Sequence, residues 1–113
     1  MISVCIATHN GEKYIKKQLE SILSQLSFSD EIVISDDGST DQTIKLIQSF
    51  EDKRIKVLTY KQHFDYSKFY LSSYYYATAN FYNALKYAQG EIIFWQIKMI
   101  FGWKTGFQFL WKR

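Results

Sequence analysis

The sequence predicts an α/β fold built on a Rossmann-like parallel sheet, and two observations carry that prediction. Short runs of apolar, β-branched residues alternate with segments whose apolar residues recur at the 3.6-residue period of a helix. Strand–helix–strand–helix–strand order of this kind is typical of parallel sheets joined by right-handed crossovers. The 113 residues suffice for one small domain, and neither an internal repeat nor a low-complexity linker divides them.

The first strand is expected at Ile2 to Ala7, an almost continuously apolar run. Thr8 to Gly11 breaks it, and Asn10 is a residue type that caps helices, which predicts a helix from about Glu12 to Gln25. The apolar face of that helix consists of Tyr14, Ile15, Leu19, Ile22, Leu23 and Leu26.

The second strand is Glu31 to Ser35, and the polar loop Asp36 to Asp41 follows it. Ser39 and Gln42 have the spacing of a capping box, which predicts that a second helix begins there. That helix carries Thr43, Ile44, Ile47 and Phe50. A third strand is expected from Arg54 to Tyr60. The strand residues expected to face the protein interior are Ile55, Val57 and Leu58.

The pattern is less regular after the third strand. Lys61 to Thr78 shows no clean period, so a loop and an irregular helix both remain open there. A helix is predicted from Ala77 to Gln89, Gly90 stands where a C-terminal cap belongs, and Glu91 to Phe94 begins another buried strand. The helix has one apolar face made of Phe81, Ala84, Leu85 and Ala88.

Composition limits the classes of protein to consider. The net charge of +3 is too small to indicate a nucleic-acid partner by itself. Cys5 is the one cysteine, so no intrachain disulfide can form, and we expect a buried strand thiol in a reducing compartment. No stretch reaches the ~20 apolar residues of a membrane span, and no basic residues precede Ile2 to Ala7 as in a signal peptide. We therefore expect a cytoplasmic protein, with contact at the inner membrane face left open.

Two polar clusters are predicted to share one edge of the sheet. Thr8 to Asn10 ends the first strand and Asp36 to Ser39 ends the second, and ligands of open α/β sheets bind beyond the carboxyl ends of the strands. A carboxylate there can accept the ring N–H of a uracil-type base, and an imidazole can stack on that base. Gly38 allows a backbone conformation closed to other residues. The alternative, which spacing alone leaves open, is that Asp36 to Asp41 is only a turn and a helix cap.

Two blocks of sequence resemble family 2 glycosyltransferases. The first block is ISVCIATHNGEKYIKKQLESILSQ with DEIVISDDGSTDQT, from Ile2 to about Gln48. The second is NALKYAQGEIIF, from Asn83 to Phe94. The resemblance implies a GT-A fold, of which this chain supplies the N-terminal half, a nucleotide-activated sugar, often of the UDP type, and a divalent Mg or Mn ion.

The resemblance also implies a set of nucleotide-binding residues. Asp37 matches the carboxylate that holds the base, with Asp36 beside it, and His9 matches the aromatic residue that lies against the base. Thr8 lines the same pocket. Ala7 departs from the proline that the family often has, and the tyrosine-rich stretch after residue 61 does not resemble the usual connection, so it receives no role.

The acidic motif that the resemblance implies after the last strand is missing. Family members place an Asp-x-Asp-type motif there to bind the metal on the diphosphate, and a later carboxylate acts as general base. Residues 95–113 contain no Asp or Glu, four basic residues and all three tryptophans. We expect residues 1–94 to be the nucleotide-sugar-binding part of a GT-A domain. We assign no catalytic residue and no metal ligand, and expect the chain alone to be inactive in the family's usual role, sugar transfer in surface polysaccharide synthesis.

Residues 95–113 have two interpretations. Back-translation of Phe94 to Trp103 as TTT TGG CAG ATC AAG ATG ATA TTT GGT TGG, with one T added to the first run, gives Phe–Leu–Ala–Asp–Gln–Asp–Asp. A frameshift product in a truncated enzyme is therefore the first interpretation. The second is a genuine tail that lies on an anionic membrane surface, in a non-catalytic module that binds a nucleotide or a protein partner. A chain that barely folds, because a sheet edge is left unpaired, is a further alternative.

Overall fold

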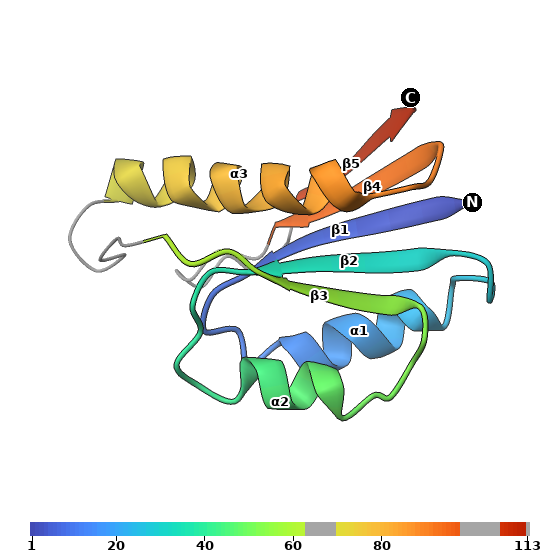
Figure 1. Cartoon of the computed structure of the whole chain (residues 1–113), viewed down its shortest axis with the longest axis horizontal. Helices are drawn as coiled ribbons and strands as arrows, with labels where there is room; N and C mark the ends of the chain where they lie inside the picture. The colour runs from blue at the N-terminus through green and yellow to red at the C-terminus, as the bar shows by residue number, and fades with distance from the viewer. Residues whose placement is uncertain (63–69, 98–106, 113) are drawn as a thin grey trace.

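The computed structural model describes residues 1–62, 70–97 and 107–112, and it is an α/β structure with a mostly parallel sheet. The elements in chain order are β1 (Ile2–Thr8), α1 (Ile15–Leu23), β2 (Glu31–Asp36), α2 (Thr43–Gln48), β3 (Ile55–Thr59), α3 (Tyr70–Tyr87), β4 (Ile92–Ile97) and β5 (Phe107–Lys112). The strand order is β3-β2-β1-β4-β5, with β1 to β4 parallel and β5 antiparallel to β4 (Figure 1). The predicted α/β parallel sheet is confirmed.

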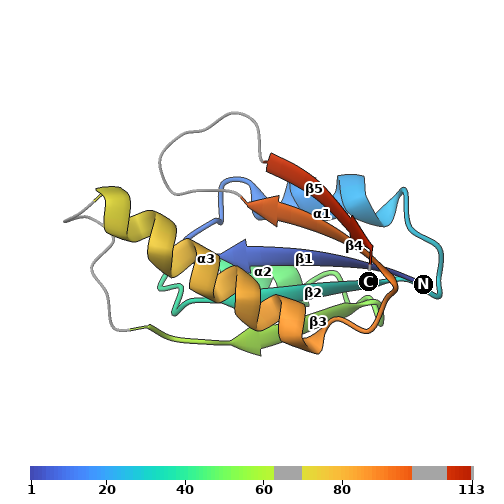
Figure 2. The ribbon, with the colours of Figure 1, turned by 90° about the horizontal axis from the view of Figure 1, so that it is seen from above.

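The elements form three layers. Helices α1 and α2 cover one face of the sheet and α3 lies across the other, as the two ribbon views agree (Figures 1 and 2). Because strand side chains alternate between faces, Val4 and Ile6 enter the core under α1 and α2, while Cys5 and Ala7 pack beneath α3. A strand covered on both faces favours apolar residues on both, which explains the almost continuously apolar run of β1. The expected burial of Cys5 is confirmed.

The predicted start of the first helix is wrong. Helix α1 begins at Ile15, after a turn in which the N–H groups of Tyr14 and Ile15 both donate to the Gly11 carbonyl at 3.0 Å. Asn10 adopts a left-handed conformation, with φ 51°, and its side-chain oxygen accepts from the Thr40 N–H instead of capping the helix. Asn10, a residue type that often caps helices, therefore connects two loops here.

The predicted capping box of the second helix is also wrong. Helix α2 begins at Thr43 after Gln42, without a side-chain cap, and Ser39 donates to Asp36 instead. Val57 was expected to face the interior, but it is 36% exposed. It belongs to the edge strand β3 and lines a shallow surface groove beside α2, which leaves it uncovered.

The segment after β3 contains more helix than the sequence period indicated. Helix α3 begins at Tyr70, well before Ala77, while residues 63–69 lie outside the described part. Gly90 does not act as a left-handed cap. A Cβ atom there would lie 2.6 Å from Ser3 Oγ and 2.8 Å from the Met1 carbonyl oxygen, so the close approach of the chain to β1 requires glycine. The Gly90 N–H donates to Ser3 Oγ at 2.8 Å.

Strand β4, whose beginning was predicted at Glu91 to Phe94, runs from Ile92 to Ile97. It runs beside β1 as far as Ile97, which lies opposite Ala7. Its other edge pairs with β5, so β4 does not supply the unpaired edge on which the alternative of a chain that barely folds depends. Among the described residues, no helix has the length and apolar character needed to cross a membrane.

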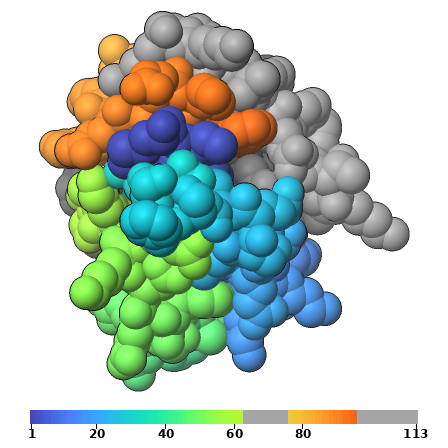
Figure 3. All heavy atoms as spheres, turned by 90° about the vertical axis from the view of Figure 1, so that its right-hand side faces the viewer, coloured from blue at the N-terminus to red at the C-terminus, as the bar shows by residue number. Residues whose placement is uncertain are grey.

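A buried carboxylate connects several segments at the amino end of the sheet. Glu31, at the start of β2, accepts from Ser3 Oγ at 2.7 Å and from the Gln89 N–H at 2.6 Å, and Lys56 Nζ lies 2.8 Å from its other oxygen. Figure 3 looks at this end, where the blue start of β1 lies between the cyan loop before β2 and the orange α3–β4 connection. Glu31 therefore joins segments that meet at this end of the sheet.

Candidate functional site

Two loops meet at the carboxyl end of β1 and β2, as the topology predicted. Thr8 and Asp36 are register partners at the ends of the two parallel strands. Among the hydrogen bonds that cross between the loops at residues 10–12 and 39–43, five are 3.2 Å or shorter. They are Asn10 N–H to Ser39 Oγ (2.8 Å), Thr40 N–H to Asn10 Oδ1 (2.8 Å), Gly11 N–H to Thr43 Oγ1 (2.8 Å), Glu12 N–H to Asp41 Oδ2 (3.2 Å) and Gln42 N–H to Glu12 Oε2 (3.0 Å). The two loops are thus fixed to each other.

Asp41 anchors this connection. Its carboxylate accepts from the N–H and the hydroxyl of Thr43 as well as from Glu12. Burial by itself would raise the pKa of Asp41, but these hydrogen bonds outweigh it and lower the pKa below its ordinary value. The loop is therefore held by an ionised side chain at neutral pH.

Asp36 holds the turn that follows β2. Its Oδ1 accepts from Thr8 Oγ1 and from Ser39 Oγ, both at 2.6 Å, and its Oδ2 accepts from the Ser39 N–H at 2.9 Å. The turn passes through Gly38, whose φ of +59° is a conformation that side-chain-bearing residues rarely adopt. Thr8 and Asp36 are both buried, so they support the turn and are not exposed at its surface.

Asp37 is the next carboxylate of the site. Its N–H donates to the Thr8 carbonyl at 2.9 Å, which places its side chain at the edge of the sheet. Its Oδ1 accepts from the Gln62 N–H at 2.6 Å, and its Oδ2 accepts from Gln62 Nε2 at 3.1 Å. Asp37 is only 2% exposed.

The ring of His9 is oriented by the same segment. His9 Nδ1 donates to the Asp37 carbonyl oxygen, so this nitrogen carries the proton, and the Asn10 side-chain nitrogen lies 3.5 Å from His9 Nε2. His9 is partly exposed, whereas Thr8, Asp36 and Asp37 are buried. The structure therefore brings the four sequence-predicted site residues together, with His9 the most accessible.

Two site residues were missed by sequence reasoning. Gln62 follows β3, and because β3 is parallel to β2, its end was due at the same edge of the sheet. Asn80, on α3, donates from Nδ2 to the Thr8 carbonyl at 3.2 Å and is buried. It stands four residues before Ala84, on the apolar face that was identified, so helical spacing could have revealed it.

The described residues do not form the metal site that the resemblance implies. In the described ranges, no three His, Cys, Asp or Glu side chains come together in a way that could hold a metal ion. Both oxygens of Asp36 and both oxygens of Asp37 already accept protein hydrogen bonds. These two carboxylates therefore do not fit a metal site.

Comparison with protein families matches this chain to Glycosyl transferase family 2 over residues 3–96. An Escherichia coli relative, UDP-Glc:alpha-D-GlcNAc-diphosphoundecaprenol beta-1,3-glucosyltransferase WfgD, is 33% identical over 94 residues. That match covers 82% of this chain and 32% of the relative. The dTDP-rhamnosyl transferase RfbG of Shigella flexneri is 46% identical over 46 residues, which are 41% of this chain and 16% of RfbG.

Solved structures show the same fold. Residues 1–349 of Staphylococcus aureus TarS in complex with UDP superpose with a TM-score of 0.66 at 28% identity, covering 85% of this chain and 26% of that one. The mannosyltransferase PcManGT of Pyrobaculum calidifontis, solved with GDP-Man and Mn²⁺, has a TM-score of 0.62 at 19% identity, covering 85% and 26%. The chain thus spans about a third or less of the length of each of these proteins.

Proposed function

Since this chain belongs to glycosyl transferase family 2, we propose that the carboxyl edge of its sheet binds the base of a nucleotide-diphosphate sugar of the UDP type. The observation that carries the proposal is the pairing of His9 with Asp37. The His9 ring donates to the Asp37 carbonyl, and the Asp37 N–H donates to the Thr8 carbonyl. An imidazole and a carboxylate are thereby held together at the edge where open α/β sheets take their ligands.

Each residue has a distinct part in this proposal. The Asp37 carboxylate accepts the ring N–H of the base, and His9 lies against the face of the base. Thr8 and Asp36 support them, because the Thr8–Asp36–Ser39 hydrogen bonds fix the turn on which Asp37 stands. The UDP complex of TarS and the UDP-glucose named for WfgD support a uridine nucleotide.

We propose that the whole protein transfers a sugar to an acceptor in surface polysaccharide synthesis. Two relatives support that role: a glucosyltransferase whose name gives alpha-D-GlcNAc-diphosphoundecaprenol as acceptor, and a dTDP-rhamnosyl transferase. The chain spans at most a third of these relatives, and residues 95–113 contain no carboxylate for a metal or a general base. We therefore propose that this chain binds the nucleotide without transferring the sugar.

We further propose that residues 95–113 arise from a frameshift. Strand β4 runs parallel to β1, with Ile97 opposite Ala7 at the carboxyl edge. In the reading frame with one T added, the first Asp after Phe–Leu–Ala would occupy position 97. That position lies at the carboxyl edge of the sheet, where Thr8 and Asp36 also lie. Resequencing the DNA across the codons for Ile93 to Gln96 and past Arg113 tests this. An extra T supports it, and the same frame in independent isolates contradicts it.

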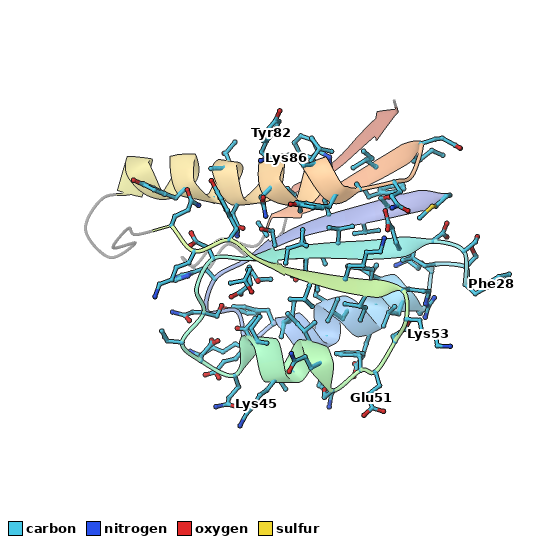
Figure 4. All side chains as sticks on the ribbon, in the orientation of Figure 1. Phe28, Lys45, Glu51, Lys53, Tyr82 and Lys86 are labelled. Carbon is cyan, nitrogen blue, oxygen red and sulfur yellow. The ribbon has the colours of Figure 1, made fainter. Side chains whose placement is uncertain are left out.

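Calorimetry with UDP tests nucleotide binding by the full 113-residue chain. We expect binding that Asp37→Ala abolishes while the variant retains its fold, as judged by circular dichroism. Lys45→Ala is a matched control, since Lys45 lies on the outer face of α2, away from the sheet (Figure 4). Equal affinity of wild type and Asp37→Ala would remove the base-binding assignment.

The second candidate is a non-catalytic module with a genuine tail at a membrane surface. The pairing of β5 with β4 favours it, because part of the tail then completes the sheet. Liposome flotation of the full chain and of a chain ending at Ile97 tests the membrane role. Binding to anionic liposomes that is lost with residues 98–113 supports it, and equal partitioning of both chains contradicts it.

A further inference from the structure

Gln62 donates twice to the carboxylate that the proposed function assigns to the base. Its backbone N–H lies 2.6 Å from Asp37 Oδ1, and its side-chain Nε2 lies 3.1 Å from Asp37 Oδ2. The same Nε2 donates to the Tyr76 carbonyl of α3 at 2.8 Å, so both of its hydrogens are engaged. One residue therefore contacts both carboxylate oxygens and also connects them to α3.

The group on Asp37 Oδ2 resembles the group that a pyrimidine base would present. A glutamine amide carries an N–H beside a carbonyl, and the ring N–H of uracil or thymine also lies beside carbonyls. With Gln62 in place, Asp37 is only 2% exposed, which leaves a base little access to either oxygen. Resting on the proposed function of Asp37, we propose that the Gln62 side chain is an internal stand-in for the base and that the base displaces it.

Displacement requires only the side chain to move. The backbone N–H of Gln62 can keep its bond to Oδ1, while rotation of the side chain breaks its bond to Oδ2, which the ring N–H of the base then replaces. The base then gains one charge-assisted hydrogen bond only after the protein has lost the bonds from Gln62 Nε2 to Asp37 Oδ2 and to the Tyr76 carbonyl. Gln62 therefore lowers the affinity for uridine nucleotides, because its amide competes with the base for Asp37 Oδ2.

Calorimetry with UMP as the probe separates this role from an ordinary contact residue. Gln62→Ala removes the competing amide and keeps the backbone donor, and Gln62→Met keeps the side-chain length without a donor. We expect both variants to bind UMP about tenfold more tightly than wild type, the size of one hydrogen bond to a charged group. Gln48→Ala, on the exposed side of α2, is the matched control with unchanged affinity.

Weaker or unchanged UMP affinity in folded Gln62→Ala and Gln62→Met overturns the proposal, since a residue that contacts the base would weaken binding when removed. A second readout is the side-chain NH₂ signal of Gln62 in ¹⁵N spectra, which we expect to shift on saturation with UMP. An unmoved signal overturns it too. Binding that depends on Asp37 but not on Gln62 removes this inference alone, whereas no binding by wild type or any variant removes the proposed function with it.

Discussion

Each end of the sheet has a buried carboxylate beside strands β1 and β2, and the two carboxylates differ in their hydrogen-bond donors. Glu31, at the amino end, takes donors from Ser3, Gln89 and Lys56, which belong to three segments far apart in the sequence. Asp37, at the carboxyl end, accepts one hydrogen bond on each carboxylate oxygen from Gln62. Both carboxylate residues are 2% exposed, so burial does not distinguish them.

The difference lies in what each carboxylate would lose if its donors moved. Loss of the Glu31 carboxylate would remove its links to β1, β3 and the α3–β4 connection, including the ion pair with Lys56, whose side chain is 45% exposed. Release of Asp37 from the Gln62 side chain needs one rotation in a segment that follows an edge strand. We infer that the amino end stabilises the fold and that the carboxyl end is the exchangeable, ligand-binding end.

The largest expected effect on stability comes from Glu31→Ala. It would leave the Gln89 N–H and Ser3 Oγ without their acceptor and Lys56 without its partner, so we expect a loss of about 3 kcal/mol in the free energy of unfolding. Urea denaturation measures it. Phe28→Ser, at a side chain that projects into solvent (Figure 4), is the control with little change. A loss below that of a surface variant would mean that Glu31 is not structural.

The next effect is expected at Gly90. A methyl group there would meet Ser3 Oγ, the Ser3 nitrogen and the Met1 carbonyl oxygen at 2.6 to 2.8 Å, and two of these are backbone atoms. Because backbone must move, we expect Gly90→Ala to lower stability by about 2 kcal/mol. Gly11→Ala is the matched control, since its Cβ would have no atom within 4 Å. Similar stability of the two variants would contradict the close approach.

The pH dependence of stability tests the contribution of the ionised Glu31 carboxylate. Burial alone would raise the pKa of Glu31, but hydrogen bonds from Gln89, Lys56 and Ser3 outweigh it and lower the pKa below its ordinary value of 4.5. A lowered pKa in the folded state means that Glu31 contributes stability above its unfolded pKa and loses it as the pH falls through the folded pKa. The midpoint temperature of thermal unfolding should therefore fall more steeply below pH 4.5 for wild type than for Glu31→Gln. Parallel curves would contradict this reasoning.

The smallest effect is expected at the loops of the carboxyl end. Asn10 combines a φ of 51° with an acceptor for the Thr40 N–H. Asn10→Ala loses both features, and we expect it to cost about 1 kcal/mol, whereas Asn10→Gly keeps the conformation and should cost less. Thermal unfolding of the two variants measures the difference. Equal or reversed costs would show that the left-handed conformation contributes nothing at Asn10.

The sequence was sufficient for the parts of the fold that depend on periodicity. The continuous apolar run of β1 predicted a strand buried on both faces, and the position of Thr8 and Asp36 at strand ends predicted that they meet. The helix starts were missed because Asn10 and Ser39 are cap residue types that instead join two loops across about 30 residues. Local pattern carries no information on such partners.

The same limit applies to the site. The candidate residues Thr8, His9, Asp36 and Asp37 were predicted from their place after strands and from resemblance to the family, and the structure brings them together. Gln62 was not found, because its segment has no clean period and its role depends on a hydrogen bond to Asp37 25 residues earlier. Position 57 was misjudged, since alternation along a strand cannot reveal that the strand lies at the edge of its sheet.

The most direct test of the difference between the two ends is a map of amide chemical shifts during titration of the full chain with UDP. We predict that the shifts concentrate at His9, Asp37, Gly38 and Gln62. The signals of Ser3, Glu31, Gln89 and Gly90 should stay in place. Shifts centred on the amino end, or none at the carboxyl end at saturating UDP, would contradict the assignment of the carboxyl end as the nucleotide site.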